Sequence, residues 1–171
     1  MMVVDLTTLK DSQLLFNFLL TPDEIELGSD AAKLKNVVET RGKLKKGIAQ
    51  TDVEGEIFAD VEVECSRCLQ PTESSLEIPL KAVFVTPENY TEAKEAELGL
   101  EDLEVSIFEG DEIDLTELAR EQILLNLPTQ VFCREDCQGL CQQCGANRNL
   151  IDCNCQKKEI DPRWSALKNL K

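Results

Sequence analysis

Cysteine is the residue that most constrains how this chain can fold. Six of its eight cysteines lie within the 23 residues from position 133 to position 155, and the other two form an isolated C-x-x-C pair upstream. The eight residues are Cys65, Cys68, Cys133, Cys137, Cys141, Cys144, Cys153 and Cys155. Because the chain contains no histidine, a metal site built from this set would rest on thiolates. Zinc takes four such ligands in a tetrahedron, and C-x-x-C spacing lets two sulfurs reach one ion from a tight turn.

Eight thiols are enough for two sites of four ligands each, and zinc is the cofactor we expect. One division forms a local site in the C-terminal segment. Its ligands would be Cys141, Cys144, Cys153 and Cys155. The other four cysteines would then tie the upstream pair to the segment that begins at Cys133. Reduced or redox-active thiols, disulfides and an iron–sulfur centre are the alternatives, and the sequence alone does not assign partners.

Nothing near the N-terminus predicts export. The apolar run 14–20 is interrupted by Asn17 and is not preceded by a basic region. No stretch approaches the length of a membrane span. We therefore expect a cytoplasmic protein, where thiols stay reduced and clustered cysteines are typical of metal sites.

The net charge of −15 limits the partners of this chain. The acidity excludes a nonspecific nucleic-acid coat, because phosphate binding depends on lysine and arginine. Contact with RNA would have to be local, either at the cysteine-rich tail or at the basic strip 33–46, which a solvated pair of strands would also explain. The candidate RNA- or partner-binding residues are Lys43, Lys45, Lys46, Arg67 and Arg148.

The hydrophobic pattern predicts a β-rich α+β fold. From Ile48 to Cys65 apolar residues alternate with acids, and the alternation returns from Leu76 to Phe84. Alternation with period two places the apolar set on one face of a strand and the acids on the other. These two strands flank the stretch CSRCLQPTES, so we expect Cys65 and Cys68 at the tip of a β-hairpin.

Shorter elements are expected around this hairpin. The stretch 1–9 predicts an opening strand, 10–20 predicts a short helix that ends ahead of Pro22, and 103–108 predicts a returning strand. Residues 87–100 are acidic and helix-prone.

A second helix is predicted with a defined start and end. Asp114 and Glu117 form a capping box ahead of apolar residues at helical spacing over 115–127, and Pro128 ends the pattern. We therefore expect a domain over 1–128, an antiparallel sheet or partial barrel with one packed helix. A cysteine-rich zinc knuckle and tail would follow over 129–171.

The sequence favours a protein that is not an enzyme. Without histidine there is no Cys–His or Ser–His pair, and no glycine loop for phosphate is present. The many carboxylates are explained as solvated faces of strands and helices. The alternative is a thiol redox enzyme or redox-sensing switch that uses Cys65 and Cys68. It requires an exposed thiolate with a lowered pKa and no bound metal.

Three blocks occur in a recognisable order. Cys65-Ser-Arg-Cys68-Leu69 follows the alternating strand, and the helix LTELAREQILLNL comes next. The third block reads Cys137-Gln-Gly-Leu-Cys141-x-x-Cys144-Gly-x-Asn147-x-Asn149 and is followed by Asp161-Pro-Arg-Trp164-x-x-Leu167. Over residues 35–170 this combination resembles the YceD family, the large ribosomal RNA subunit accumulation proteins of bacteria with plastid relatives.

The resemblance implies a noncatalytic ribosome-biogenesis factor. Its role would be the accumulation or processing of large-subunit ribosomal RNA. The implied partner is a ribosomal RNA precursor or a basic ribosomal protein, met through the basic strip and the cysteine tail, with no membrane or DNA involved. Because some relatives lack part of the cysteine set, the implied role of the metal is to fold a tail too short to build its own core.

Overall fold

The computed structural model describes residues 2–9, 12–28, 32–87, 90, 105–108 and 110–155. These residues form mostly β-sheet, with one short helix, α2. The strands are β1 (Val3–Asp5), β2 (Gln13–Leu20), β3 (Ala32–Leu34), β4 (Val38–Lys46), β5 (Gln50–Glu64), β6 (Pro71–Val85), β7 (Val105–Ile107) and β8 (Glu112–Asp114), and α2 covers Leu115–Leu125. No helix formed by this part of the chain is long and apolar enough to cross a membrane.

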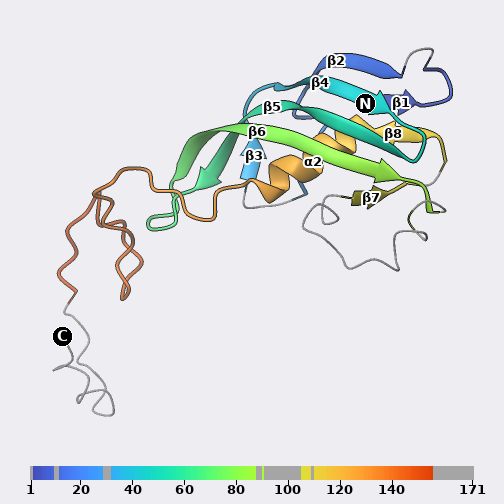
Figure 1. The fold of residues 1–171 in the computed structure, drawn as a ribbon. Coiled ribbons are helices and arrows are strands. Elements are labelled where there is room, and N and C mark those ends of the chain that lie inside the picture. Colours follow the sequence, from blue (N-terminus) through green and yellow to red (C-terminus); the bar gives the residue numbers. More distant parts are fainter. Residues whose placement is uncertain are drawn as a thin grey trace, which may run out of the picture.

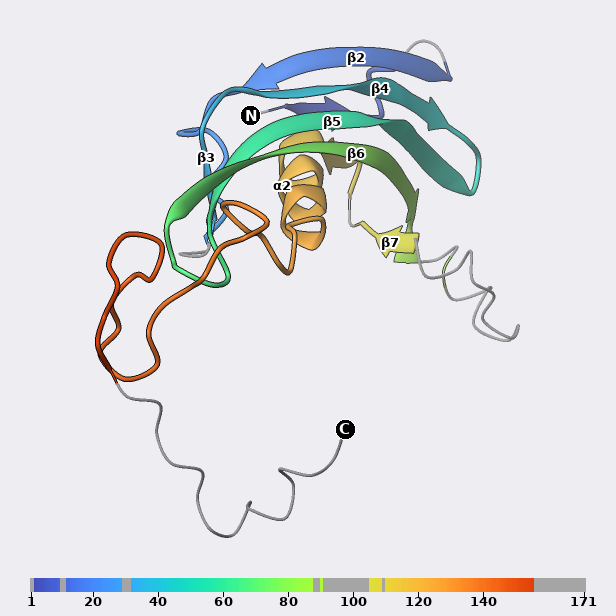
Figure 2. The same ribbon diagram turned by 90° about the vertical axis from the view of Figure 1, so that its left-hand side faces the viewer.

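One curved sheet dominates the architecture. Its strand order is β2-β4-β5-β6-β7, and β3 pairs with β5 beyond the end of β4. All pairings in it are antiparallel except β6 with β7, which is parallel and departs from the antiparallel sheet expected. The sheet bends over α2, and the separate ribbon of β1 and β8 lies on the same concave side (Figures 1 and 2).

The long hairpin of β5 and β6 confirms the predicted alternation. Val53, Ile57 and Val61 of β5 are fully buried, whereas the acids between them point outward. α2 closes the concave face with Leu115 and Ile123. Burying one such side chain contributes about 1.5–3 kcal/mol, so this face supplies the core.

Two glycines let β4 and β5 approach closely at the centre of the sheet. Gly42 pairs with Gly55 across these strands, and Phe16 of β2 lies opposite Gly42 on the other side. A Cβ added to Gly42 would lie 2.9 Å from the Cα of Gly55 and 2.8 Å from the Phe16 ring. A larger residue at either position would push the strands apart, so the close pairing of β4 with β5 depends on these glycines.

The start of α2 is fixed by the cap that the sequence predicts. The Asp114 carboxylate accepts hydrogen bonds from the backbone N–H groups of Thr116 at 2.8 Å and Glu117 at 3.1 Å. The Thr116 hydroxyl in turn accepts the backbone N–H of Met2 at 2.6 Å. The helix ends at Leu125, slightly before the predicted end at residue 127. Its first residue, Leu115, donates its N–H to the carbonyl of Met2, just ahead of β1, at 2.9 Å.

The helix predicted over 10–20 is wrong, because Gln13–Leu20 forms strand β2 and pairs with β4 along its whole length. Phe16 and Leu20 are buried at 5% and 2% exposure, whereas Leu15 and Leu19 are 74% and 64% exposed. The period is therefore two, but apolar residues on the outer face concealed it.

The remaining predicted elements divide into those confirmed and those outside the described residues. β1 and β7 lie within the predicted strands 1–9 and 103–108. Most of the acidic stretch 87–100 and the block that contains Trp164 lie outside the described residues. The expectations for them stay predictions.

Candidate metal centre

Four cysteines from two distant parts of the chain meet at the tip of the β5–β6 hairpin. We call this group, Cys65, Cys68, Cys133 and Cys137, the hairpin site. All its sulfurs lie within 4.8 Å of one another. The Sγ atoms of Cys65 and Cys137 are 3.9 Å apart, and those of Cys68 and Cys133 are 3.6 Å apart. A tetrahedron with Zn–S bonds of about 2.3 Å places its sulfurs about 3.8 Å apart, so this donor set fits zinc.

The hairpin turn shapes one half of this site. The Leu69 backbone N–H donates to the Cys65 carbonyl at 2.9 Å, and Leu69 adopts a left-handed φ of 60°. The segment after α2 supplies the other half and is tied to the turn by a hydrogen bond from the Ser66 N–H to the Val131 carbonyl, at 2.7 Å. The Cys133 N–H points at the Cys65 sulfur, at 3.4 Å. Backbone N–H groups aimed at sulfur stabilise the thiolate form that a metal requires.

The thiols of the hairpin site differ in their readiness to ionise. Burial opposes ionisation of Cys65, but the backbone N–H groups of Cys133, Arg67 and Cys68 outweigh it and lower the Cys65 pKa to about 6. Burial, followed by hydrogen bonds with neighbouring thiols, raises the pKa of Cys133 to about 12. Thiols this close cannot all carry a charge on their own, and a bound cation would let all four ionise.

The other four cysteines form a second group within a short stretch. We call Cys141, Cys144, Cys153 and Cys155 the tail site, and its sulfurs also lie within 4.8 Å of one another. Gly145 makes the required turn with a φ of 71°, and its N–H donates to the Cys141 carbonyl at 2.9 Å. Hydrogen bonds from the backbone N–H groups of Cys144 and Gln143 help lower the Cys141 pKa to about 6. Cys144 and Cys155 are exposed, so this site is the more accessible one.

Asn149 links the two sites, although the sequence analysis assigned it no role beyond its place in the resemblance. It lies among the tail-site residues, yet its side-chain amide donates to the Cys137 sulfur of the hairpin site at 3.3 Å. Its side-chain oxygen accepts the Gln138 N–H and the Arg134 guanidinium, both at 2.8 Å. Such partners outside the ligand set orient the ligands. The N-x-N spacing after the cysteines was the only available signal.

Arg67 holds the tail against the hairpin. Its guanidinium donates to the carbonyls of Cys137 at 3.0 Å and Glu135 at 3.2 Å, and it stacks 4.2 Å from the ring centroid of Phe132. The Arg67 carbonyl accepts the Leu140 N–H at 3.0 Å. These contacts explain why an arginine stands between the two hairpin cysteines, because a planar cation can stack and donate in several directions at once.

The three lysines among the other candidate RNA- or partner-binding residues lie at the far end of the β4–β5 pairing from Arg67. Lys43 and Lys45 lie on β4, and the Lys43 ammonium contacts Glu54 of β5 at 2.8 Å. Lys46 donates to the Leu6 carbonyl at 2.8 Å. Arg148 is exposed in the tail. The register of β4 against β5 thus places acids beside the basic strip and offsets part of its charge.

Comparison with known proteins places the chain in a family. The uncharacterized protein YlbN of Bacillus subtilis is 31% identical over 146 residues, which cover 85% of this chain and 80% of that relative. An uncharacterized protein of Mycobacterium tuberculosis is 33% identical over 115 residues, which cover 67% of this chain and 53% of the relative. The chain thus spans about half the length of the mycobacterial relatives it matches.

A plant protein is also similar. The Arabidopsis thaliana protein named large ribosomal RNA subunit accumulation protein YCED homolog 1, chloroplastic, is 35% identical over 63 residues, 37% of this chain and 20% of its own length. No solved structure matches. The family model described as large ribosomal RNA subunit accumulation protein YceD matches residues 53–171, which include most of β5, all of β6 and α2, and all eight cysteines. Since this match spans well over half of the chain, the protein belongs to the YceD family.

Proposed function

We propose that this chain is a noncatalytic factor that supports accumulation or processing of large-subunit ribosomal RNA during ribosome assembly. In this proposal it binds a basic ribosomal protein in the cytoplasm and carries zinc in both cysteine sites. The observation that carries the role is membership of a family named for accumulation of the large ribosomal RNA. The metal supports the fold of the tail, and the sheet domain meets the partner.

Zinc is supported by the chemistry of the donors. Each site offers four thiols within 4.8 Å of one another, and the sulfur spacings of 3.6 and 3.9 Å in the hairpin site suit a tetrahedral ion. Zinc would supply charge neutralisation and a crosslink, not chemistry, because a closed four-thiolate shell leaves no position for a substrate.

A basic protein is a better partner for this chain than bare RNA. The net charge of −15 repels phosphates and attracts lysine and arginine. Lys43 and Arg41, which lie on the basic strip, are each already paired with an acid of β5 at 2.8 Å. Free positive charge for phosphate is therefore scarce on the strip where RNA contact was expected.

The role can be tested by deleting the gene in its host and measuring the ratio of large- to small-subunit ribosomal RNA. We expect the ratio to fall and to recover when the wild-type chain is supplied. In vitro, purified protein should bind basic ribosomal proteins of the large subunit but not fragments of its RNA at physiological salt. An unchanged RNA ratio would refute the role, and tight RNA binding without protein binding would refute the partner.

The redox alternative receives less support from the geometry. Although the pKa of Cys65 is lowered to about 6, its side chain is fully buried, and its sulfur lies 3.9 Å from Cys137. Cys68 likewise faces Cys133 at 3.6 Å, so the hairpin pair is half of a four-thiol group. Thiol labelling that speeds up on addition of a chelator supports zinc. Fast labelling of Cys65 or Cys68 in protein that contains no metal would support the redox switch instead.

A further inference from the structure

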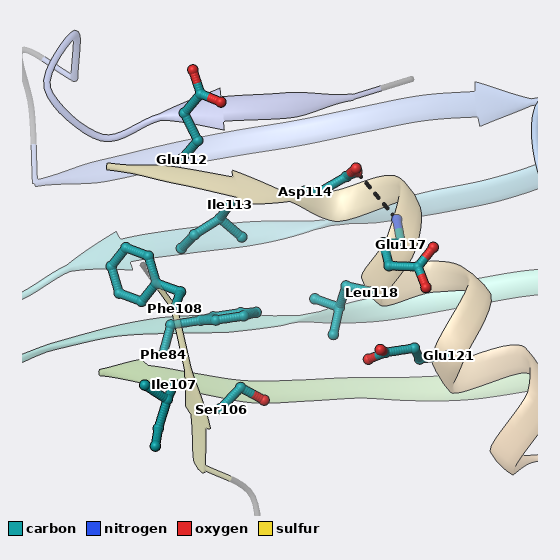
Figure 3. A pocket seen from close by; sticks show the side chains of 10 residues that line it. All are labelled: Phe84, Ser106, Ile107, Phe108, Glu112, Ile113, Asp114, Glu117, Leu118 and Glu121. Carbon is teal, nitrogen blue, oxygen red and sulfur yellow. Dashed lines mark hydrogen bonds between the residues drawn. The ribbon is translucent and has the colours of Figure 1, made fainter. Parts of the chain in front are cut away.

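A groove lies at the end of the sheet away from the cysteines, where β7 and β8 meet the first turns of α2 (Figures 1 and 3). Its volume is about 420 Å³. Neither metal site contributes a residue to it. Its lining combines an apolar floor with a rim of carboxylates, and these two features together define what it can bind.

The floor is aromatic and aliphatic. Phe84 of β6 and Phe108 pack edge to face with ring centroids 6.1 Å apart. Ile113 of β8 and Leu118 of α2 complete the floor, and Figure 3 shows these side chains around one shared space. Ile107, on edge strand β7, is 51% exposed at the mouth. Exposed apolar surface joined to a groove is typical of a docking site for another molecule.

The rim is negatively charged. Glu112 of β8 and Glu117 and Glu121 of α2 line the groove and are exposed. A neighbouring hollow shares Glu112 and adds Asp5 and Asp111. Among the described residues that line these two hollows, none is lysine or arginine. Arg120 partly offsets Glu117 at 3.3 Å, and the charge of Lys46 acts on Asp5. The surface therefore combines an apolar pocket with a rim whose side-chain charges are all negative.

We infer that this groove binds a lysine- and arginine-rich segment of a ribosomal protein that carries one aromatic or aliphatic anchor. The anchor would occupy the floor beside Ile107, and the flanking cations would meet the carboxylates of the rim. Complementary charge of this kind sets specificity and speeds association. The inference rests on the proposed function and deepens it, because it gives the partner a binding place.

Charge argues against the other occupants. Nucleic acid would bring phosphates to the carboxylates of the rim. A second copy of this chain carries a net charge of −15 and would be repelled at an acidic surface. Residues 91–104 of the chain itself hold six acids and one lysine, so like charge opposes their docking there as well. A basic segment is the occupant that both the rim and the floor favour.

The test uses the full metal-bound chain and a fluorescent synthetic peptide of lysine and arginine with one central phenylalanine. The groove variant combines Glu112→Gln, Glu117→Gln and Glu121→Gln. The matched control removes three exposed acids elsewhere, with Asp23→Asn, Glu26→Gln and Glu77→Gln. Fluorescence anisotropy at physiological salt should give about tenfold weaker binding for the groove variant, because each exposed ion pair contributes little alone. The control should bind like the wild type.

A second variant tests the floor. Ile107→Ser changes an exposed side chain on an edge strand, so the fold should survive, which circular dichroism would verify. It should weaken binding of the phenylalanine peptide but leave binding of the same peptide with serine in that place unchanged. An equal loss of peptide affinity in the groove variant and the control variant would overturn the inference, since the peptide would then be attracted by the net charge of the chain alone. Binding gained only when residues 91–104 are deleted would also overturn it, because that segment would then occupy the groove.

The two proposals can fail separately. If a basic ribosomal protein binds the wild type and the groove triple equally well, the groove inference is refuted while the proposed function stands. If no basic ribosomal protein binds the wild type but the synthetic peptide still responds to the groove variants, the proposed partner is refuted. The groove then remains a site for basic peptides, without the link to ribosomal proteins.

Discussion

Loss of metal from the hairpin site should destabilise the whole sheet, whereas loss from the tail site should not. The perturbations are Cys137→Ser in the hairpin site and Cys155→Ser in the tail site. The ligands of the hairpin site come from residues 65–68 and 133–137, so the β5–β6 hairpin cannot unfold without releasing this metal. All ligands of the tail site lie within residues 141–155, so that site can persist while the sheet unfolds.

The size of the effect follows from mass action. A metal present at about a thousand times its dissociation constant stabilises the state that binds it by about 4 kcal/mol. For a chain of this length each kcal/mol shifts Tm by about 2–4 °C, so Cys137→Ser should lower the Tm of the sheet by about 8–16 °C. Cys155→Ser should leave this Tm close to that of the wild type.

Thermal melts followed by far-ultraviolet circular dichroism would measure these shifts at a buffered concentration of free zinc. Elemental analysis should give two zinc ions per wild-type chain and one in each variant. The reasoning is refuted if both variants shift Tm equally. It is also refuted if Cys137→Ser loses one metal while its Tm stays unchanged, because the hairpin site would then not be coupled to the sheet.

Three further results are expected. Gly42→Ala should lower the free energy of unfolding in urea by about 1–3 kcal/mol, because its Cβ would press on the facing strand, whereas Lys45→Ala on the same strand should have little effect. Asn149→Ala should weaken metal binding at the hairpin site by about tenfold to a hundredfold in a chelator competition, whereas the control Asn154→Ala should not. Equal metal affinities of the two variants would contradict the role of Asn149 in orienting Cys137. Metal affinity should rise with pH across the neutral range, because the Cys133 thiol, whose pKa is raised to about 12, must lose its proton to bind the metal. Calorimetry in buffers of different ionisation enthalpy would detect the released protons, and metal binding without proton release would contradict the prediction.

The sequence predicted the elements whose two faces differ in polarity. On β5, acids fill the outward positions except those of Gln50 and Phe58, and the alternation is plain, so both the strand and its buried face could be predicted. On β2, Leu15 and Leu19 make the outward face apolar as well, and the period could not be recognised without the pairing to β4. A strand can be distinguished from a helix by periodicity only where the solvent face is polar.

At the candidate site, one of the divisions of the cysteines that the sequence left open matches the two groups in the structure, but the sequence did not predict their surroundings. The C-x-x-C pairs made the grouping plausible because two sulfurs of such a pair reach one ion. The stacking of Arg67 on Phe132 and the bond from Asn149 to Cys137 join residues that are far apart in sequence or lie in different sites. No periodicity encodes such contacts, so they emerge only from the folded chain. The pairing of Lys43 with Glu54 follows from strand register in the same way.

The packing of the described residues separates what the metal must do from what the sheet does alone. The apolar core of the sheet and α2 contains no cysteine, whereas Cys65, Cys68 and Cys137 form a buried cluster of their own with Cys133 and Leu140 against it. The sheet can therefore fold around its apolar core, and zinc would add stability and fix the tail to the hairpin tip. Because the acid-rimmed groove lies at the opposite end of the sheet, binding of a basic segment there should not require the tail site. Cys155→Ser should therefore bind the synthetic phenylalanine peptide as tightly as the wild type, and a clear loss of affinity would show that the two ends are coupled.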